Sequence, residues 1–250
     1  MMPPQLLPPS STMKINKLCH FLVRSGNLLL RELSDFVYPR ICGGCARRLS
    51  HHERGICLGC KLALQPFIYE ESLLHLRFTS FFVPISAVKA GFIFSRDSIA
   101  RHIVHSIKYA HNKDAGLELG KLLARKTLIS NADFDLIVPV PIHRSKFADR
   151  RYNQATIIAQ GLSEETGIPV QEHALRRVEY PMSQTRRNRV ARMQAMQGAF
   201  RKGRDFPQVP KRILLIDDVL TTGATLAEAA KVLMLSHPSS VTILAATVDV

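Results

Sequence analysis

Two adjacent carboxylates and a threonine-rich turn follow a short apolar run near the end of the chain. Residues 212–226 read RILLIDDVLTTGATL, in which Asp217 and Asp218 come directly after the four apolar residues 213–216. Such a run is typical of a strand buried in a parallel sheet. A helix-forming run follows the turn, whose residues are Thr221, Thr222, Gly223, Ala224 and Thr225. Because the N–H groups of such a turn and the positive end of the next helix point at one place, we predict a phosphate site there.

The two carboxylates need a different partner, since they would repel a phosphate. We expect them to accept hydrogen bonds from sugar hydroxyls or to hold Mg²⁺ through water. Two other interpretations compete, an ordinary strand–helix turn and a Walker B strand. A Walker B strand requires a Walker A loop, and the nearest stretch, residues 115–123, has Ala115 in place of the first glycine and Leu122 in place of the Ser or Thr. The sequence therefore favours a sugar-phosphate site.

Four cysteines form two pairs with the same short spacing, Cys42-x2-Cys45 and Cys57-x2-Cys60. Two C-x-x-C pairs with glycines beside them are typical of a closed, tetrahedral, structural zinc site. A redox role for one pair is the alternative. We expect His51 and His52 to lie on the surface, because four thiolates already complete a zinc site.

Positive charge is concentrated in two segments. The formal net charge of +14 at pH 7 indicates an anionic substrate or a polyanionic partner, or else a generally basic proteome. Residues 176–204 hold nine Lys or Arg, one acidic residue and two aromatics, Tyr180 and Phe200. A long polar stretch of this kind is typical of a lid, a binding loop or a disordered segment. The scarcity of aromatics indicates either charge-led binding of single-stranded DNA without base preference or no DNA binding at all. The candidate nucleic-acid contacts are Arg186, Arg187, Arg189 and Arg192.

A second basic segment follows the apolar run 135–140, which ends in Pro139. A basic turn after a parallel strand predicts a second anion site by the same geometry, and a basic surface loop is the alternative. The cations of this turn are Arg144, Lys146, Arg150 and Arg151.

The elements that would position these residues alternate between strands and helices. Apolar runs predict strands at 87–94, 135–140, 213–217 and 241–248. They predict helices at 98–109, 115–128 and 226–235, and a further helix that follows the basic turn and ends at about residue 165. Residues 65–84 read as a connector. This order predicts an α/β fold with a doubly wound, mostly parallel sheet.

The N-terminal part carries no signal for export or for a membrane span. Residues 1–15 are expected to be disordered, and residues 16–36 to form a packing helix or a membrane-surface helix. Either Met1 or Met13 is a candidate start. No apolar run is long enough to span a bilayer, and no signal peptide is recognised, so we expect a cytoplasmic protein.

Several blocks, in this order, resemble the competence protein F (ComF) family: DFVYPRICGGC, the second C-x-x-C, HSIKYAH, residues 135–155, residues 184–200 and the acidic-pair loop. The acidic-pair loop itself resembles the signature of type I phosphoribosyltransferases. The resemblance, which covers about residues 34–250, implies a small zinc-ribbon-like module and a phosphoribosyltransferase-like domain. We place an N-terminal helix with the four-cysteine module at 16–66 and the phosphoribosyltransferase-like domain at 85–250. Departures from the family are Ala195, where Asn is frequent, and Ala148-Asp149, where a more basic pair is common.

The resemblance also implies ligands and roles. In this family the acidic pair holds the ribose hydroxyls of 5-phosphoribosyl-1-pyrophosphate (PRPP), bound with Mg²⁺. Asp217 and Asp218 then take the catalytic position, and the turn from Thr221 to Thr225 holds the 5′-phosphate. The resemblance implies that Pro139, Arg150 and Arg151 bind the pyrophosphate of PRPP.

For function, the resemblance implies a PRPP-binding protein linked to the uptake or processing of single-stranded DNA in natural transformation. A competence helicase or recombination proteins would then be its partners. Two alternatives stay open: a nucleobase-salvage phosphoribosyltransferase, for which we identify no base-reading hood, and a PRPP-sensing regulator without turnover. The sequence names no acceptor, and it indicates no oligomeric state.

Overall fold

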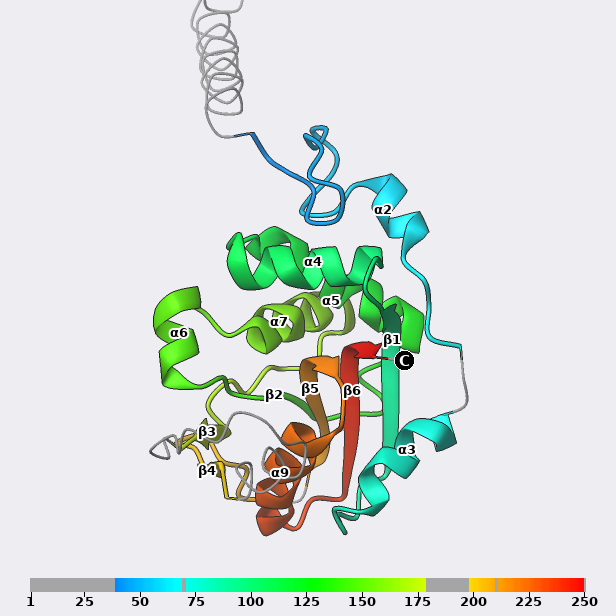
Figure 1. The fold of residues 1–250 in the computed structure, drawn as a ribbon. Helices are drawn as coiled ribbons and strands as arrows, with labels where there is room; N and C mark the ends of the chain where they lie inside the picture. The colour runs from blue at the N-terminus through cyan, green and yellow to red at the C-terminus, as the bar shows by residue number, and fades with distance from the viewer. Residues whose placement is uncertain (1–38, 69–70, 179–197, 210, 250) are drawn as a thin grey trace, which may run out of the picture. The chain divides into compact units, whose positions relative to one another are not determined.

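The computed structural model describes residues 39–68, 71–178, 198–209 and 211–249 (Figure 1). Residues Ile41–Val250 form one compact unit, and nearly all of the other unit, Met1–Arg40, lies outside the described residues. The predictions for residues 1–15 and 16–36 therefore fall outside them as well. The boundaries of the two predicted domains, 16–66 and 85–250, stay predictions.

A four-stranded parallel sheet forms the centre of the described chain. Its order is β1 (Ala87–Phe94), β6 (Ser240–Asp249), β5 (Arg212–Leu220) and β2 (Leu136–Pro139), and all three pairings are parallel (Figure 1). The central strands are almost fully buried apolar runs, as expected for a sheet that is covered on both faces.

Alternate residues of each strand enter two separate hydrophobic cores. On β5, Leu214 and Ile216 pack with the helices α4 (Ile99–Tyr109), α5 (Lys113–Thr127) and α7 (Gln154–Thr166). Their neighbours Ile213 and Leu215 pack on the other face with α3 (Glu71–Thr79) and α9 (Ala224–Leu233). This period of two places helices on both faces, and it confirms the predicted doubly wound, mostly parallel α/β sheet.

The expected connector at residues 65–84 is wrong, because α3 forms within it. Leu74 and Phe78, four residues apart, are buried in the core, whereas Leu73 and Leu76 are exposed. Apolar residues on both sides of the helix hide the helical period from the sequence. The short helix α2 (Leu58–Ala63) also precedes this segment.

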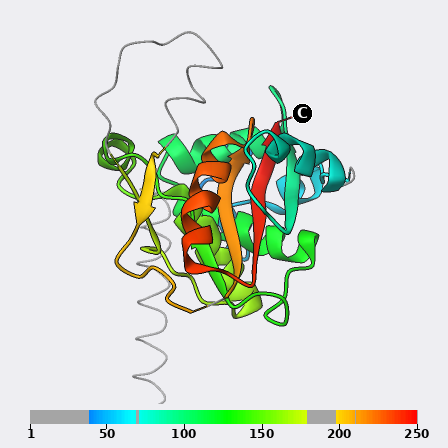
Figure 2. The same cartoon turned by 90° about the horizontal axis from the view of Figure 1, so that it is seen from below.

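Two further elements differ from the sequence-based expectation. The basic turn after β2 is itself a helix, α6 (Arg144–Arg150), which ends where Arg151 adopts a left-handed conformation with φ 62°. The long polar stretch begins and ends in paired strands, β3 (Leu175–Arg177) and β4 (Phe200–Lys202). Figure 2 shows β4 as a yellow arrow outside the central sheet. Residues 179–197 lie outside the described part.

In the part of the chain that the structure describes, no helix combines the length and the apolar character needed to cross a membrane.

Candidate functional site

The acidic pair lies at the carboxyl end of the sheet, where one edge of β5 is open. β2 ends at Pro139, and its last register partner is Ile216, the residue before Asp217. β5 itself continues to Leu220, beyond the expected end, because β6 still pairs with it as far as Val248. Asp217 and Asp218 therefore lie within the strand rather than after it. Ligands of open α/β sheets bind beyond the carboxyl ends of the strands, so the position suits a binding site.

A lysine from α4 pairs with the second carboxylate. The Nζ atom of Lys108 lies 2.7 Å from Oδ2 of Asp218, and both side chains are largely buried. The backbone of β5 is held on the other side, where the hydroxyl of Thr247 donates to the carbonyl of Asp218 at 2.8 Å. Sequence reasoning assigned no role to Lys108, although the residue stands in the HSIKYAH block. That block was the signal that could have found it.

Asp217 has an unusual protonation equilibrium. Burial, followed by the negative charge of Asp218, raises the pKa of Asp217 from the ordinary 3.8 to about 7, against the opposing charges of Lys108 and Arg177. The N–H of Asp218 donates to Oδ1 of Asp217 at 2.8 Å. Asp217 therefore keeps its proton up to near-neutral pH, so it can donate a hydrogen bond to a hydroxyl group as well as accept one.

Several cations surround the acidic pair. Burial lowers the pKa of Lys146, and so do the positive charges of Arg150, Arg177 and Lys108, while Asp218 raises it. Burial also lowers the pKa of Arg177, and the charge of Asp217 opposes this shift. Like charges are crowded here, which favours an anionic ligand between them. The sequence indicates Lys146 only as part of the basic turn and gives no signal for Arg177.

The residues predicted for the pyrophosphate side do not all come together. Pro139 pairs with Ile216, directly beside the acidic pair, and Arg150 belongs to the cation group. Arg151 is exposed, and its N–H ends α6 by donating to the carbonyl of Phe147 at 2.7 Å. None of these interactions joins Arg151 to the carboxylates. Its assigned role stays a prediction.

The threonine-rich turn leads directly into α9. Gly223 is the residue before the helix and has φ 82°, and no side chain at this cap position accepts from the first N–H groups of α9. These groups are therefore available to a ligand. Only the weak contact from the N–H of Ala224 to Oγ1 of Thr222, at 3.5 Å, lies inside the turn. Thr221 is exposed, and Thr225 is partly buried in the first turn of the helix.

Helix α3 holds this turn in place. Arg77 donates to the carbonyl of Thr221 at 2.7 Å and to that of Asp249 at 2.9 Å, so it joins the turn to the end of β6. The ring of Phe78 packs against Gly223, where an added Cβ would lie 3.0 Å from Cζ of Phe78. Glycine is needed here both for its positive φ and for the close contact.

The run Tyr152-Asn153-Gln154 links α6 to α7. The side chain of Asn153 caps α7 by accepting from the N–H of Ala155 at 3.2 Å, and it donates to the carbonyl of Val140 at 2.9 Å. Arg150 donates to Oε1 of Gln154 at 2.9 Å. These contacts fix the end of α6, which carries Arg150, relative to the end of β2.

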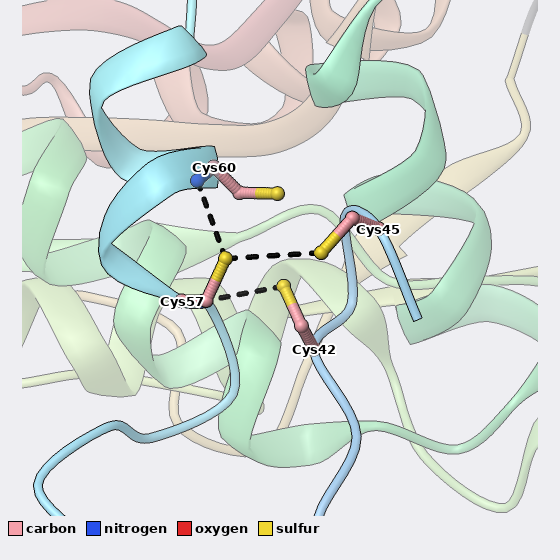
Figure 3. Close-up of side chains that lie close together, drawn as sticks. All are labelled: Cys42, Cys45, Cys57 and Cys60. Carbon is pink, nitrogen blue, oxygen red and sulfur yellow. Dashed lines mark hydrogen bonds between the residues drawn. The ribbon is translucent and has the colours of Figure 1, made fainter. Parts of the chain in front are cut away.

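The four predicted metal ligands meet in one cluster (Figure 3). The Sγ atoms of Cys42, Cys45, Cys57 and Cys60 all lie within 4.8 Å of one another, and those of Cys45 and Cys57 are 3.8 Å apart. Thiolates about 2.3 Å from a tetrahedral zinc ion would be about 3.8 Å apart, so the donor set and its spacing fit zinc. His51 and His52 are exposed and lie outside the cluster, as expected.

Backbone N–H groups surround the sulfur atoms. Sγ of Cys42 accepts from Gly44 at 3.4 Å and from Cys57 at 3.2 Å, and Sγ of Cys57 accepts from Cys60 at 3.3 Å. Burial raises the pKa of Cys57, but the N–H of Cys60 and the guanidinium of Arg47 outweigh burial and hold the pKa at about 6. Such donors stabilise thiolates, the form that binds a metal.

The cysteine cluster packs on the start of α5. Asn112 donates to the carbonyl of Ile41 at 3.1 Å, and Lys61 forms an ion pair with Glu118 at 2.5 Å. Gly55 approaches so closely that an added Cβ would lie 2.2 Å from the backbone nitrogen of Ala115. The cluster therefore supports the same helical layer that carries Lys108.

The candidate nucleic-acid residues Arg186, Arg187, Arg189 and Arg192 lie outside the described residues. A separate cleft of about 600 Å³ lies at the opposite, amino-terminal ends of β2 and β5, where Leu136 and Lys211 line it with Gln171, His173 and Phe206. None of the predicted site residues lines this cleft.

The sequence is similar to two groups of curated proteins. Competence protein F of Haemophilus influenzae is 35% identical over 100 residues, which cover 40% of this chain and 44% of that protein. DNA utilization protein YhgH of Salmonella typhi is 26% identical over 144 residues, or 56% of this chain and 63% of that protein. The match thus spans less than two thirds of the length of either relative. No family model matches the sequence.

Two solved structures are also similar. Glutamine phosphoribosylpyrophosphate amidotransferase from B. subtilis is 21% identical with a TM-score of 0.38, covering 54% of this chain and 26% of that one. Hypoxanthine-guanine phosphoribosyl transferase of L. donovani is 18% identical with a TM-score of 0.31, and the match covers 53% of this chain and 65% of that one. The two curated relatives confirm the resemblance that the ordered sequence blocks indicated: this chain is similar to Competence protein F and to the YhgH DNA utilization proteins.

Proposed function

We propose that this chain binds a phosphoribosyl ligand, PRPP, at the carboxyl ends of β2 and β5, and that it serves the uptake or processing of DNA. One observation carries the proposal. A carboxylate pair on the open edge of β5 is followed by an uncapped helix start and is surrounded by cations. A sugar that carries phosphate groups offers hydroxyls to the carboxylate pair, and it offers anionic phosphates to the helix start and to the cations.

We assign each part of PRPP to a part of the site. The N–H groups and hydroxyls from Thr221 to Thr225 bind the 5′-phosphate. Asp217 and Asp218 bind the ribose hydroxyls. Because the ammonium of Lys108 already neutralises Asp218, this form of the pair suits hydroxyl groups better than direct coordination of Mg²⁺. The cations Lys146, Arg150 and Arg177 face the pyrophosphate.

This arrangement also suits transfer of the ribosyl group. Positive side chains stabilise the departing pyrophosphate, and the carboxylates stabilise the positive charge that develops on the ribose ring while a nitrogen nucleophile attacks C1. Mg²⁺ bound with PRPP would supply further neutralisation of the pyrophosphate. A nucleobase-salvage transferase and a PRPP sensor without turnover would share this site, so turnover has to be measured.

The four cysteines would hold a structural zinc ion. They form a closed set of four thiolates, three of them buried, which leaves no position for a substrate. The zinc would tie residues 42–60 to α5, and through the helical layer it would help to position Lys108.

The link to DNA comes from the relatives, whose names refer to competence and to DNA utilization. For this chain the link to DNA is a proposal. We also propose single-stranded DNA and a competence helicase or recombination proteins as its partners, and the cytoplasm as its location. The net charge of +14 is consistent with a polyanionic partner.

Calorimetric titration with PRPP and Mg²⁺ tests the proposal, with ribose 5-phosphate and short single-stranded DNA as parallel ligands. Asp217→Asn combined with Asp218→Asn should abolish PRPP binding and leave the fold intact. The matched control is Glu164→Gln with Glu165→Gln, another adjacent acidic pair in ion pairs, on α7. DNA binding without PRPP binding in the unmodified protein would refute the phosphoribosyl site and leave the basic surface as the functional part.

A further inference from the structure

Two aromatic rings lie together on the exposed side of α4. The ring centroids of His105 and Tyr109 are 4.5 Å apart with an interplanar angle of 45°. Residues four apart share one face of a helix, and this face is turned to solvent. His105 is exposed, and Tyr109 keeps 61% of its surface exposed although it touches two neighbours. More than half of the surface of Tyr109 is therefore accessible from solvent.

A guanidinium group completes the arrangement. Cζ of Arg150, at the end of α6, lies 5.4 Å from the centroid of the Tyr109 ring. The hydrogen bond from Arg150 to Gln154 holds this side chain in place. Aromatic rings and arginine planes are the surfaces on which single-stranded nucleic acids stack their bases.

These rings adjoin the proposed phosphoribosyl site. Lys108, the residue before Tyr109, reaches Asp218 at 2.7 Å. Arg150 is linked to the acidic pair only through Lys146, since the charges of both Arg150 and Asp218 act on the pKa of Lys146. The tilted ring pair and the acidic pair are thus linked through Arg150 and Lys146, and along the chain from Tyr109 to Lys108.

We propose that Tyr109, with His105 and Arg150, forms a stacking platform for the nucleobase of a nucleotide whose sugar and phosphate occupy the site at Asp217 and Asp218. The base belongs to a free ribonucleotide, whose sugar keeps the hydroxyls that Asp217 and Asp218 bind. This inference rests on the proposed function. It identifies an aromatic base as the class of acceptor that the same site takes. Stacking reads the flat face that every base has, so binding is tolerant of base identity.

Two ligands that differ only by the base separate the platform from the rest of the site. Ribose 5-phosphate and adenosine 5′-monophosphate are titrated by calorimetry into the zinc-loaded full chain. The nucleotide should bind the unmodified protein more tightly. Tyr109→Ala should weaken nucleotide binding by about 5- to 150-fold, with little change for ribose 5-phosphate.

Matched variants test the role of the ring. Tyr109→Phe should keep the nucleotide affinity, because it keeps the aromatic face. His105→Ala should weaken it less than Tyr109→Ala does. His102→Ala, which removes an exposed histidine from the same helix outside the ring pair, should have no effect. Should Tyr109→Ala unfold, Tyr109→Leu keeps an apolar side chain without the aromatic face and serves in its place.

The outcomes distinguish the platform from the function on which it rests. If ribose 5-phosphate binds but the affinity ratio of the two ligands is the same in Tyr109→Ala, the platform is refuted and the phosphoribosyl site stands. If ribose 5-phosphate fails to bind while the nucleotide binds through Tyr109, the platform stands and the proposed function is refuted.

Discussion

The ammonium nitrogen of Lys108 lies 2.7 Å from a carboxylate oxygen of Asp218, in an ion pair that joins α4 to the carboxyl end of β5. Both side chains are largely buried, with 19% and 14% of their surface exposed. The pair brings a cation to a place where two adjacent carboxylates would otherwise repel an anionic ligand. It therefore makes an acidic pair compatible with a phosphorylated sugar.

Replacing Lys108 should weaken the binding of PRPP. In Lys108→Met the two carboxylates lose their nearest cation, so the site becomes more negative toward an anionic ligand, and the affinity should fall at least about tenfold. Calorimetric titration measures the change. Lys126→Met, which removes an exposed lysine from the last turn of α5, is the charge-matched control. Equal PRPP affinity in Lys108→Met and the control would make Lys108 a purely structural residue.

The raised pKa of Asp217 predicts a pH-dependent stability. Between about pH 4 and pH 7 the folded protein keeps a proton on Asp217 that the unfolded chain has released. This contribution to stability is complete below about pH 4 and is lost as the pH rises through about 7. Asp217→Asn removes this titration. The Tm of the variant minus the Tm of the unmodified protein should therefore be larger at pH 8 than at pH 5, by about 2–4 °C for each kcal/mol of stability that the unmodified protein loses between the two pH values.

Scanning calorimetry at the two pH values measures this difference. Asp97→Asn, at an exposed aspartate, should show no comparable change between pH 5 and pH 8. A Tm difference for Asp217→Asn that is the same at both pH values would mean that Asp217 is not the titrating group.

Gly223→Ala should impair both the fold and the phosphate turn. The left-handed φ of 82° costs an L-residue about 1–2 kcal/mol, and the new methyl group would press on Phe78 at 3.0 Å. The free energy of unfolding should fall by at least that amount, and ribose 5-phosphate should bind more weakly. Denaturant unfolding and calorimetry measure the two effects. Gly59→Ala, inside α2, brings the new Cβ only to an ordinary contact of 4.0 Å with Sγ of Cys57, so it should not destabilise the protein. If both variants lose equal stability, the special role of Gly223 is refuted.

Removal of one cysteine should remove the zinc. The unmodified protein, prepared under reducing conditions, should contain about one zinc ion per chain. Cys42→Ser should reduce the zinc content to near zero and lower Tm by roughly 5–10 °C, for a loss of about 2–3 kcal/mol. Elemental analysis and thermal unfolding check both expectations. Cys19→Ser, outside the described residues, is the matched control and should retain the metal. Full zinc content in Cys42→Ser would contradict a four-thiolate site.

Any binding of single-stranded DNA should depend steeply on salt. If Arg186, Arg187, Arg189 and Arg192 bind phosphates, the slope of log affinity against log salt should decrease in magnitude by about 0.7 for each of these arginines that is replaced by Gln. Fluorescence anisotropy over a range of salt concentrations measures the slope. A flat dependence in the unmodified protein would exclude charge-led binding.

Local patterns sufficed for much of the fold and for part of the site. The apolar runs predicted all four strands of the central sheet, and α4 begins after Ser98, whose side chain caps it at the predicted start of the helix. The four cysteines meet as their spacing predicted. These features could be read from the sequence because each depends on residues that are neighbours in the chain or that repeat with the period of a strand or helix.

By itself, then, the sequence determined the α/β order, the acidic-pair loop and the four-cysteine set. Only the tertiary structure decided which distant side chains complete the site: Lys108 from α4, Arg177 from β3, and Arg77 and Phe78 from a helix that the sequence concealed. It also decided that β5 runs on past the acidic pair, because the partner strand β6 continues beside it. Long-range pairing and packing set these relationships, and neither leaves a periodic signal in the residues concerned.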